Sequence, residues 1–98
     1  MGGCWVYILH CADNSYYTGT TRLSDPTERA AEHNLGENPR AWTYKRRPVK
    51  LVWAEHFQFI SDAVSFERQL KGWSRRKKEA VISGDWDNLP YLSKRGRA

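Results

Sequence analysis

Apolar and polar positions follow two different periods along this chain of 98 residues. Apolar-rich runs at 5–11 and 16–21 flank the polar turn sequence ADNS, which is the pattern of a β-hairpin. A third run, VKLVWAEHF at 49–57, also predicts a strand. Because Leu51 to Ala54 are all apolar, we expect this third strand to be central in the sheet and covered on both faces.

A helix is predicted after the hairpin. Asp25 has the side chain of an N-cap, Pro26 suits the first helical position, and Glu28 completes a variant of the capping box. The helix should run to about Asn34, since Gly36 just beyond it is a typical stop.

Two further helices follow the third strand. Ser61 is the expected cap of the first, along which one apolar stripe is formed by Ala63, Phe66 and Leu70. Gly72 and Ser74 should break this helix, and 74–83 is predicted to be a short basic helix that ends near Gly84.

The predicted order is strand, strand, helix, strand, helix, helix. This order indicates an α+β fold, in which helices flank a three-stranded antiparallel sheet. We expect residues 1–84 to form the domain and 85–98 to be an irregular tail.

Positive charge is concentrated in the second part of the chain. The formal net charge is +5, composed of −3 up to Pro39 and +8 from Arg40 onward. Three clusters carry the excess: RAWTYKRRPVK in a predicted loop, RQLKGWSRRKK, and SKRGR. Lysine and arginine interleaved with Trp and Tyr suit a nucleic-acid backbone, although charge alone fits a solvated basic surface equally well. The candidate contacts are Lys45, Arg46, Arg47, Lys71, Arg75, Arg76 and Lys77.

The sequence shows no signal-peptide pattern and no apolar run of membrane-spanning length, so the expected location is the cytoplasm and no membrane partner is expected. Cys4 and Cys11 lie seven positions apart on one predicted strand and should point to opposite faces. We therefore expect two buried free thiols. The spacing of the Cys and His residues matches no zinc motif.

Several polar residues are candidates for chemistry. Arg29 and His33 are four positions apart and share a helix face, which is also common on an exposed surface. Glu67 borders the apolar stripe and could pair with a lysine one turn later or hold a divalent metal. Tyr7 and Tyr17 share a face of the hairpin only if the turn has three residues or the strand a bulge.

These residues carry a resemblance. The segments WVYIL…YYTG, TERAAEH, the basic loop and SFERQLKGWSRRKKEAVI resemble the GIY-YIG nuclease superfamily, and in particular its small single-domain bacterial members. The likeness covers residues 5 to about 84. It implies a three-stranded antiparallel sheet flanked by helices, a nuclease-like domain, and DNA rather than RNA as substrate.

The resemblance also implies roles for individual residues. Glu67 would bind Mg²⁺ or Mn²⁺, and Arg29 would hold the scissile phosphate. Tyr7 is the preferred general base, its phenol pKa lowered by the arginine and the metal, while Tyr17 and His33 orient water or phosphate. Which tyrosine has which role stays open. The motif glycine falls on Gly19, where bare backbone would allow a helix or a phosphate to approach closely.

The chain departs from the family pattern in places. The first motif reads WVY and the second YTG, and Asn88 is the sole candidate for a C-terminal asparagine found in many relatives. Better understood relatives add a DNA-binding or partner domain, so a protein partner that supplies substrate specificity is one expectation. Two alternatives remain: a catalytically inactive nucleic-acid-binding module with the same basic face, and a basic domain that docks on an acidic protein. The module would have no need of Glu67, since a carboxylate repels phosphate.

Overall fold

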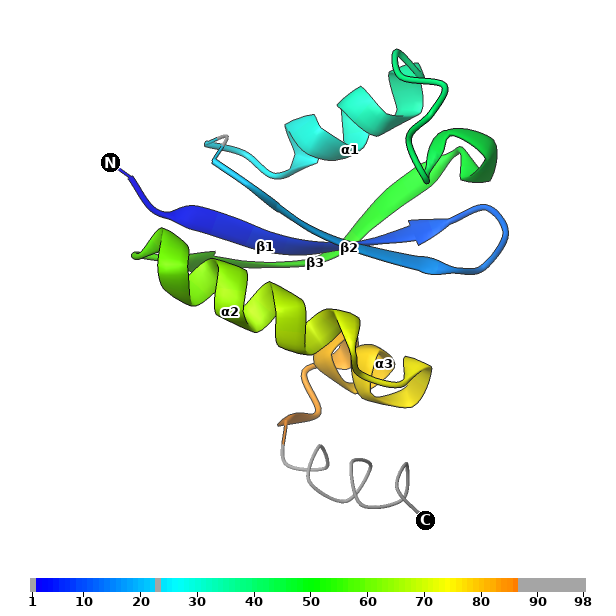
Figure 1. The fold of residues 1–98 in the computed structure, drawn as a ribbon. Coiled ribbons are helices and arrows are strands. Elements are labelled where there is room, and N and C mark those ends of the chain that lie inside the picture. Colours follow the sequence, from blue (N-terminus) through cyan, green and yellow to red (C-terminus); the bar gives the residue numbers. More distant parts are fainter. Residues whose placement is uncertain (1, 23, 87–98) are drawn as a thin grey trace.

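The computed structural model describes residues 2–22 and 24–86. Its elements occur in the predicted order, and the α+β fold with a three-stranded antiparallel sheet is confirmed (Figure 1). The elements are β1 (Cys4–Cys11), β2 (Tyr16–Thr21), α1 (Thr27–Leu35), the 3₁₀ turn η1 (Tyr44–Arg46), β3 (Val49–Phe57), α2 (Ile60–Lys71) and α3 (Arg75–Ser83).

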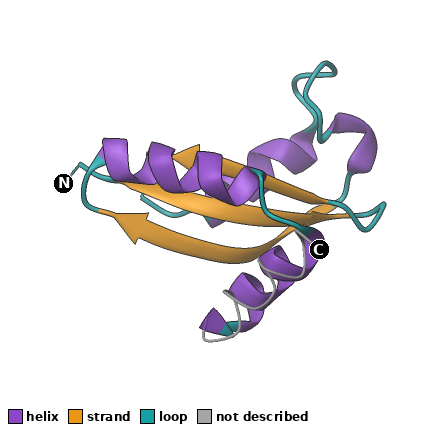
Figure 2. Cartoon of the chain, turned by 60° about the horizontal axis from the view of Figure 1, so that its bottom comes forward, coloured by secondary structure: helices purple, strands orange, loops and turns teal. Residues whose placement is uncertain are grey.

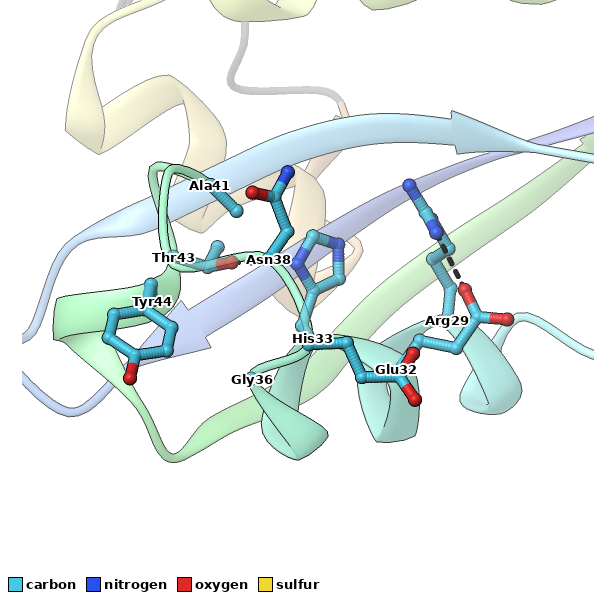
Figure 3. A pocket seen from close by; sticks show the side chains of 9 residues that line it. Arg29, Glu32, His33, Gly36, Asn38, Ala41, Thr43 and Tyr44 are labelled. Carbon is cyan, nitrogen blue, oxygen red and sulfur yellow. Dashed lines mark hydrogen bonds and ion pairs between the residues drawn. The ribbon is translucent and has the colours of Figure 1, made fainter.

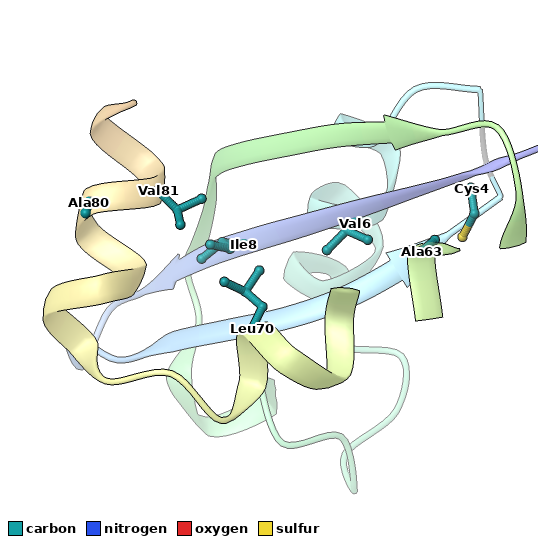
Figure 4. Packing of buried hydrophobic residues seen from close by; sticks show 7 residues of the cluster. All are labelled: Cys4, Val6, Ile8, Ala63, Leu70, Ala80 and Val81. Atoms are coloured by element: carbon teal, nitrogen blue, oxygen red, sulfur yellow. The ribbon is translucent and has the colours of Figure 1, made fainter. Parts of the chain in front are cut away.

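The sheet is a middle layer with helices on both faces. Helix α1 covers one face, and α2 and α3 cover the other (Figures 1 and 2). Because successive side chains of β1 alternate between faces, each face has its own core. The core under α2 and α3 is drawn in Figure 4 and contains Cys4, Val6, Ile8, Ala63, Leu70, Ala80 and Val81. The core under α1 contains Tyr7, Leu9, Cys11, Ala30 and Val49.

The prediction that the third strand is central was wrong. The strand order is β2-β1-β3, so β1 is central and β3 lies at an edge. A β-bulge between the pairs Ile8–Trp53 and Leu9–Leu51 turns Val52 and Trp53 toward the same core. The apolar run therefore reflects helices on both faces of an edge strand and says nothing about which strands flank it.

The helix starts were predicted with mixed success. Asp25 does accept hydrogen bonds from the Thr27 backbone N–H and hydroxyl, although the helix itself begins at Thr27. Ser61 is not a cap, because α2 already begins at Ile60 without any side-chain cap. Ser74 caps α3 by accepting a hydrogen bond from the Lys77 backbone N–H.

The remaining expectations concern cysteines, membranes and the tail. Cys4 and Cys11 are buried free thiols in opposite cores, as predicted. Among residues 2–22 and 24–86, no helix has the length and apolar character needed to cross a membrane. Helix α3 ends at Ser83, and most of the predicted 85–98 tail, including Asn88 and the SKRGR cluster, lies outside the described residues. The domain boundary stays a prediction.

Candidate active site

The turn of the hairpin sets the positions of the two motif tyrosines. Cys11 N–H donates to the Ser15 carbonyl, which closes a three-residue loop, and Asn14 takes the left-handed conformation (φ 71°) that such a loop requires. In the resulting register Tyr7 lies opposite Gly19 and Leu9 opposite Tyr17. Tyr7 and Tyr17 therefore share the face of the sheet that α1 covers, as the three-residue alternative predicted.

Gly19 has a different role from the one expected. A Cβ atom at Gly19 would lie 2.6 Å from the Tyr7 hydroxyl oxygen and 3.0 Å from Cε2 of Tyr17. The glycine is buried, and the Tyr7 ring fills the space above it. Its missing side chain thus makes room for a tyrosine and leaves no open backbone for a phosphate.

Helix α1 places Arg29 and His33 over the tyrosines. Ala30 is buried, and its small side chain allows the helix to lie close to the sheet. Nε2 of His33 is 3.3 Å from the Tyr7 hydroxyl, and Nδ1 is 2.7 Å from the hydroxyl of buried Thr43. The Arg29 guanidinium lies near enough to the Tyr7 hydroxyl to act on its pKa, and it forms an ion pair with Glu32 at 2.6 Å.

Aromatic contacts join the same residues. The Tyr17 ring centre lies 5.3 Å from that of His33 and 6.3 Å from that of Tyr7. Tyr17 also stacks with Trp42, whose ring centre is 5.8 Å away. Residues from β1, β2, α1 and the loop before η1 therefore meet in one cluster.

The protonation states of this cluster differ from expectation. Burial raises the pKa of Tyr7 to about 12, and the hydrogen bond from Arg29 only partly opposes this effect. The expected lowering of the Tyr7 pKa is thus not found among the groups of this chain. Burial, and secondly the charge of Arg29, lower the pKa of His33, which favours a neutral imidazole at neutral pH.

The two phenols also differ in access. Tyr7 is 1% exposed, whereas Tyr17 is half-buried and lines a cavity at the edge of the sheet. Arg29 and His33 extend from α1 into a second cavity of about 350 Å³ (Figure 3). Its other lining residues are Glu32, Gly36, Glu37, Asn38, Ala41, Thr43 and Tyr44.

Glu67 lies apart from this cluster, on α2 at the other face of the sheet. Its side chain is 14% exposed and its carboxylate forms an ion pair with Lys71 at 2.7 Å, as the spacing predicted. The connection to the tyrosines is indirect: β2 is an edge strand, and Lys71 lines the same edge cavity as Tyr17. The carboxylate is therefore one helical turn from a residue that reaches the cavity of Tyr17.

The donors around Glu67 fit a magnesium-type ion better than a zinc-type site. Among the residues that the structure describes, no group of three or more His, Cys, Asp and Glu side chains converges. Mg²⁺ is held by one or two carboxylates and keeps several of its waters, so a single, largely buried carboxylate is a suitable donor set. The Lys71 ammonium would have to move aside.

Several predicted nucleic-acid contacts already have structural partners. Arg46 lies 3.8 Å above the Trp42 ring and 3.1 Å from Asp13, and Arg47 donates to the Tyr44 carbonyl. The Arg75 side chain donates to the Asn14 carbonyl and pairs with Glu79, and Lys77 lies 3.9 Å above the Trp73 ring. Lys45 and Arg76 are exposed. The partnered cations thus stabilise the loop before β3 and helix α3, in addition to any role in binding phosphate.

Sequence reasoning missed three residues of this region. Thr43 fixes the His33 ring, Trp42 stacks on Tyr17, and the amide of Asn34 exchanges two hydrogen bonds with the Val49 backbone, which anchors β3 beside α1. None had a motif, although the Trp within a basic cluster was a signal for Trp42.

Comparison with known proteins identifies the family of this chain. The sequence profile of the GIY-YIG catalytic domain matches residues 3–80. The chain belongs to the GIY-YIG family. Membership indicates a nuclease-like domain that acts on nucleic acid, and GIY-YIG nucleases generally use divalent metals.

Several proteins are similar to this chain over most of their own length. A UPF0213 protein of Haloquadratum walsbyi is 44% identical over 85% of this chain and 90% of its own length. One of Listeria innocua is 43% identical over 81% and 84% of the two chains. The solution structure of a UPF0213 protein from Bacillus halodurans is 38% identical, covers 84% of each chain and has a TM-score of 0.53. A solution structure from E. faecalis has 33% identity, 86% coverage of each chain and a TM-score of 0.58.

Proposed function

We propose that this GIY-YIG domain is a divalent-metal-dependent endonuclease that hydrolyses phosphodiester bonds in DNA. The observation that carries the proposal is the convergence of Tyr7, Tyr17, Arg29 and His33 on one face of the sheet, where a hydrogen bond joins Tyr7 to His33 and ring contacts join the tyrosines and the histidine. The preference for DNA over RNA comes from the family resemblance alone.

Arg29 is the proposed phosphate clamp. Its side chain is 40% exposed, and Arg29 lines the 350 Å³ cavity, where a phosphate can replace Glu32 as its partner. A guanidinium can donate two parallel hydrogen bonds to phosphate oxygens and offsets the charge that develops during hydrolysis.

Tyr17 replaces Tyr7 as the proposed general base. Tyr7 is fully buried, and its high pKa disfavours ionisation, so it is better suited to position Arg29 and His33. The half-buried Tyr17 can reach substrate from the edge cavity. As a phenolate, Tyr17 would accept the proton of the attacking water, and neutral His33, whose ring centre lies 5.3 Å from that of Tyr17, would orient the Tyr17 ring.

Glu67 is the proposed ligand of Mg²⁺ or Mn²⁺. When bound, the ion would supply Lewis acidity and stabilise the leaving 3′ oxygen. Helix α2, which carries Glu67, packs against β2, the edge strand that carries Tyr17. Without a metal, the carboxylate is neutralised by its ion pair with Lys71. Loss of that lysine partner is the change in this chain that metal binding requires.

Cleavage of labelled duplex, single-stranded and branched DNA and RNA with Mg²⁺, Mn²⁺ or EDTA tests the proposal. Glu67→Gln should lower the cleavage rate by about 10²-fold or more, and Tyr17→Phe by a similar factor. Glu79→Gln is the matched control, because Glu79 also forms an i,i+4 ion pair, with Arg75 at 3.2 Å, but on α3. It should cut at the wild-type rate.

Two results would contradict the proposal. If wild type and Glu67→Gln cut equally well, the metal ligand is wrong. If the protein binds DNA but cuts none of the substrates with either ion, the chain is the binding module instead, or needs a protein partner. Addition of host-cell extract to the wild type and to Glu67→Gln separates these two cases.

A further inference from the structure

A cavity of about 460 Å³ opens at the free edge of β2, on the side away from β1. It is distinct from the cavity of Arg29 and His33, and α2, α3, β2 and the loop before η1 contribute to it. Its lining residues are Tyr16, Tyr17, Thr18, Trp42, Lys71 and Lys78. Within the described part of the chain, no carboxylate lines it.

Two lysines give this cavity its charge. Lys78 is half-buried on α3 and has no acidic partner within ion-pair distance among the described residues, and Lys71 is paired with Glu67. Burial, and secondly repulsion from Lys71, lower the pKa of Lys78. An anion in the cavity would remove the repulsion between the two ammonium groups and replace the water that Lys78 has lost.

A buried hydroxyl in the cavity wall points to the same kind of ligand. Thr18 is 3% exposed, and its hydroxyl has no hydrogen-bond partner among the described residues. Buried hydroxyl groups are nearly always hydrogen-bonded, so an orphaned one needs an explanation. Rotation of the Thr18 side chain toward the cavity that it lines would give this hydroxyl a phosphate oxygen as acceptor.

An aromatic surface lies beside the cations. Trp42 is 44% exposed, although its ring stacks on Tyr17 and carries the Arg46 guanidinium at 3.8 Å. Aromatic rings next to lysines are the arrangement with which proteins hold nucleic-acid strands, since bases stack on the rings while cations bind phosphates.

We propose that this edge cavity is a second phosphate subsite, which holds a non-scissile phosphate of the nucleic-acid strand between Lys78 and Lys71, with the flanking base against Trp42. The inference rests on the proposed function and extends it. Tyr17 belongs both to this cavity and to the tyrosine–histidine cluster, so a phosphate held here fixes the strand next to the scissile bond. Lys78 is a positioning residue in this arrangement.

Binding of a short fluorescent single-stranded oligonucleotide in EDTA, followed by anisotropy at several salt concentrations, tests the subsite. Lys78→Met keeps the length of the side chain and removes its charge. We expect an affinity loss of about 5- to 10-fold and a slope of log K against log[salt] that is smaller by about 0.7. Lys78→Arg should restore the slope. Lys50→Met is the matched control, because Lys50 is exposed on β3 at the opposite edge of the sheet.

A second variant separates a binding role from a structural one. Thr18→Val removes the orphaned hydroxyl and keeps the shape of the side chain. It should raise the melting temperature and weaken oligonucleotide binding, two effects that a purely structural hydroxyl would not produce together. Trp42→Leu should weaken binding of a normal strand more than binding of a strand with abasic sites.

The outcomes distinguish the subsite from the nuclease activity. Equal affinity and equal salt slope for wild type and Lys78→Met would overturn the subsite, whatever the cleavage assay shows. If wild type never cuts but Lys78→Met loses affinity and slope, the subsite stands and the endonuclease proposal fails.

Discussion

Replacement of Gly19 with alanine tests whether the hairpin glycine exists to accommodate Tyr7. The new Cβ would lie 2.6 Å from the Tyr7 hydroxyl oxygen, 2.8 Å from Cζ and 3.0 Å from Cε2 of Tyr17. Tyr7 is 1% exposed and packed between sheet and α1, so its ring has little room to move. Overpacking of this kind costs about 1–3 kcal/mol.

Part of that cost is recovered in the unfolded chain. Alanine has fewer unfolded conformations than glycine, which stabilises the protein by about 0.4–1 kcal/mol where the native backbone allows it. The net loss should therefore be about 0.5–2 kcal/mol in the free energy of unfolding. Each kcal/mol corresponds to about 4–8 °C in the melting temperature of a chain of this size. Urea unfolding followed by tryptophan fluorescence measures the change.

Gly72→Ala is the matched control. Gly72 has a right-handed helical conformation (φ −83°, ψ −6°), and a methyl group at this position would have the Gln69 carbonyl oxygen as its nearest neighbour, at 3.6 Å. This variant should be as stable as wild type or slightly more stable. If Gly19→Ala unfolds at the same urea concentration as Gly72→Ala, the steric reasoning is refuted. If Gly19→Ala loses oligonucleotide binding without losing stability, the result would instead support the original expectation that a phosphate approaches the backbone at Gly19.

Three further predictions concern local interactions. Ser74→Ala should lower the free energy of unfolding by about 1 kcal/mol, because it removes a helix cap, whereas Ser61→Ala should change it little; urea unfolding of both variants tests this. Asn34→Ala should cost about 1–3 kcal/mol, since two backbone groups of Val49 lose their partners, and hydrogen exchange should quicken at the start of β3. His33 has a lowered pKa in the folded state, so its contribution to stability should be complete above about pH 7 and be lost as the pH falls below about 6.5 toward the folded value. His33→Gln should flatten that part of the stability–pH curve, and an unchanged curve would contradict a buried neutral histidine.

Much of the fold follows from the sequence because its signals are local. The three strands and three helices were placed to within one or two residues, since alternation of apolar residues and glycine stops act on neighbouring residues. The pairing of Glu67 with Lys71 follows from helix geometry in the same way. The prediction that Ser61 caps α2 was wrong, because the helix begins one residue earlier, at Ile60, and has no side-chain cap.

The order of the strands, the exposure of the two tyrosines and the protonation of the site residues depend on contacts between distant segments. Only the tertiary structure decided them. An apolar run on 49–57 could not reveal that β1, not β3, has a strand on each side. The pairing of Tyr17 with Leu9 rested on one left-handed residue, Asn14, in the turn. The raised pKa of Tyr7 arises from burial beneath α1, and the edge cavity with Lys78 requires α3 to lie beside β2. The sequence by itself determined the elements and the residues capable of chemistry, whereas packing across the sheet determined which of them meet, because those distances are set by side chains far apart in the chain.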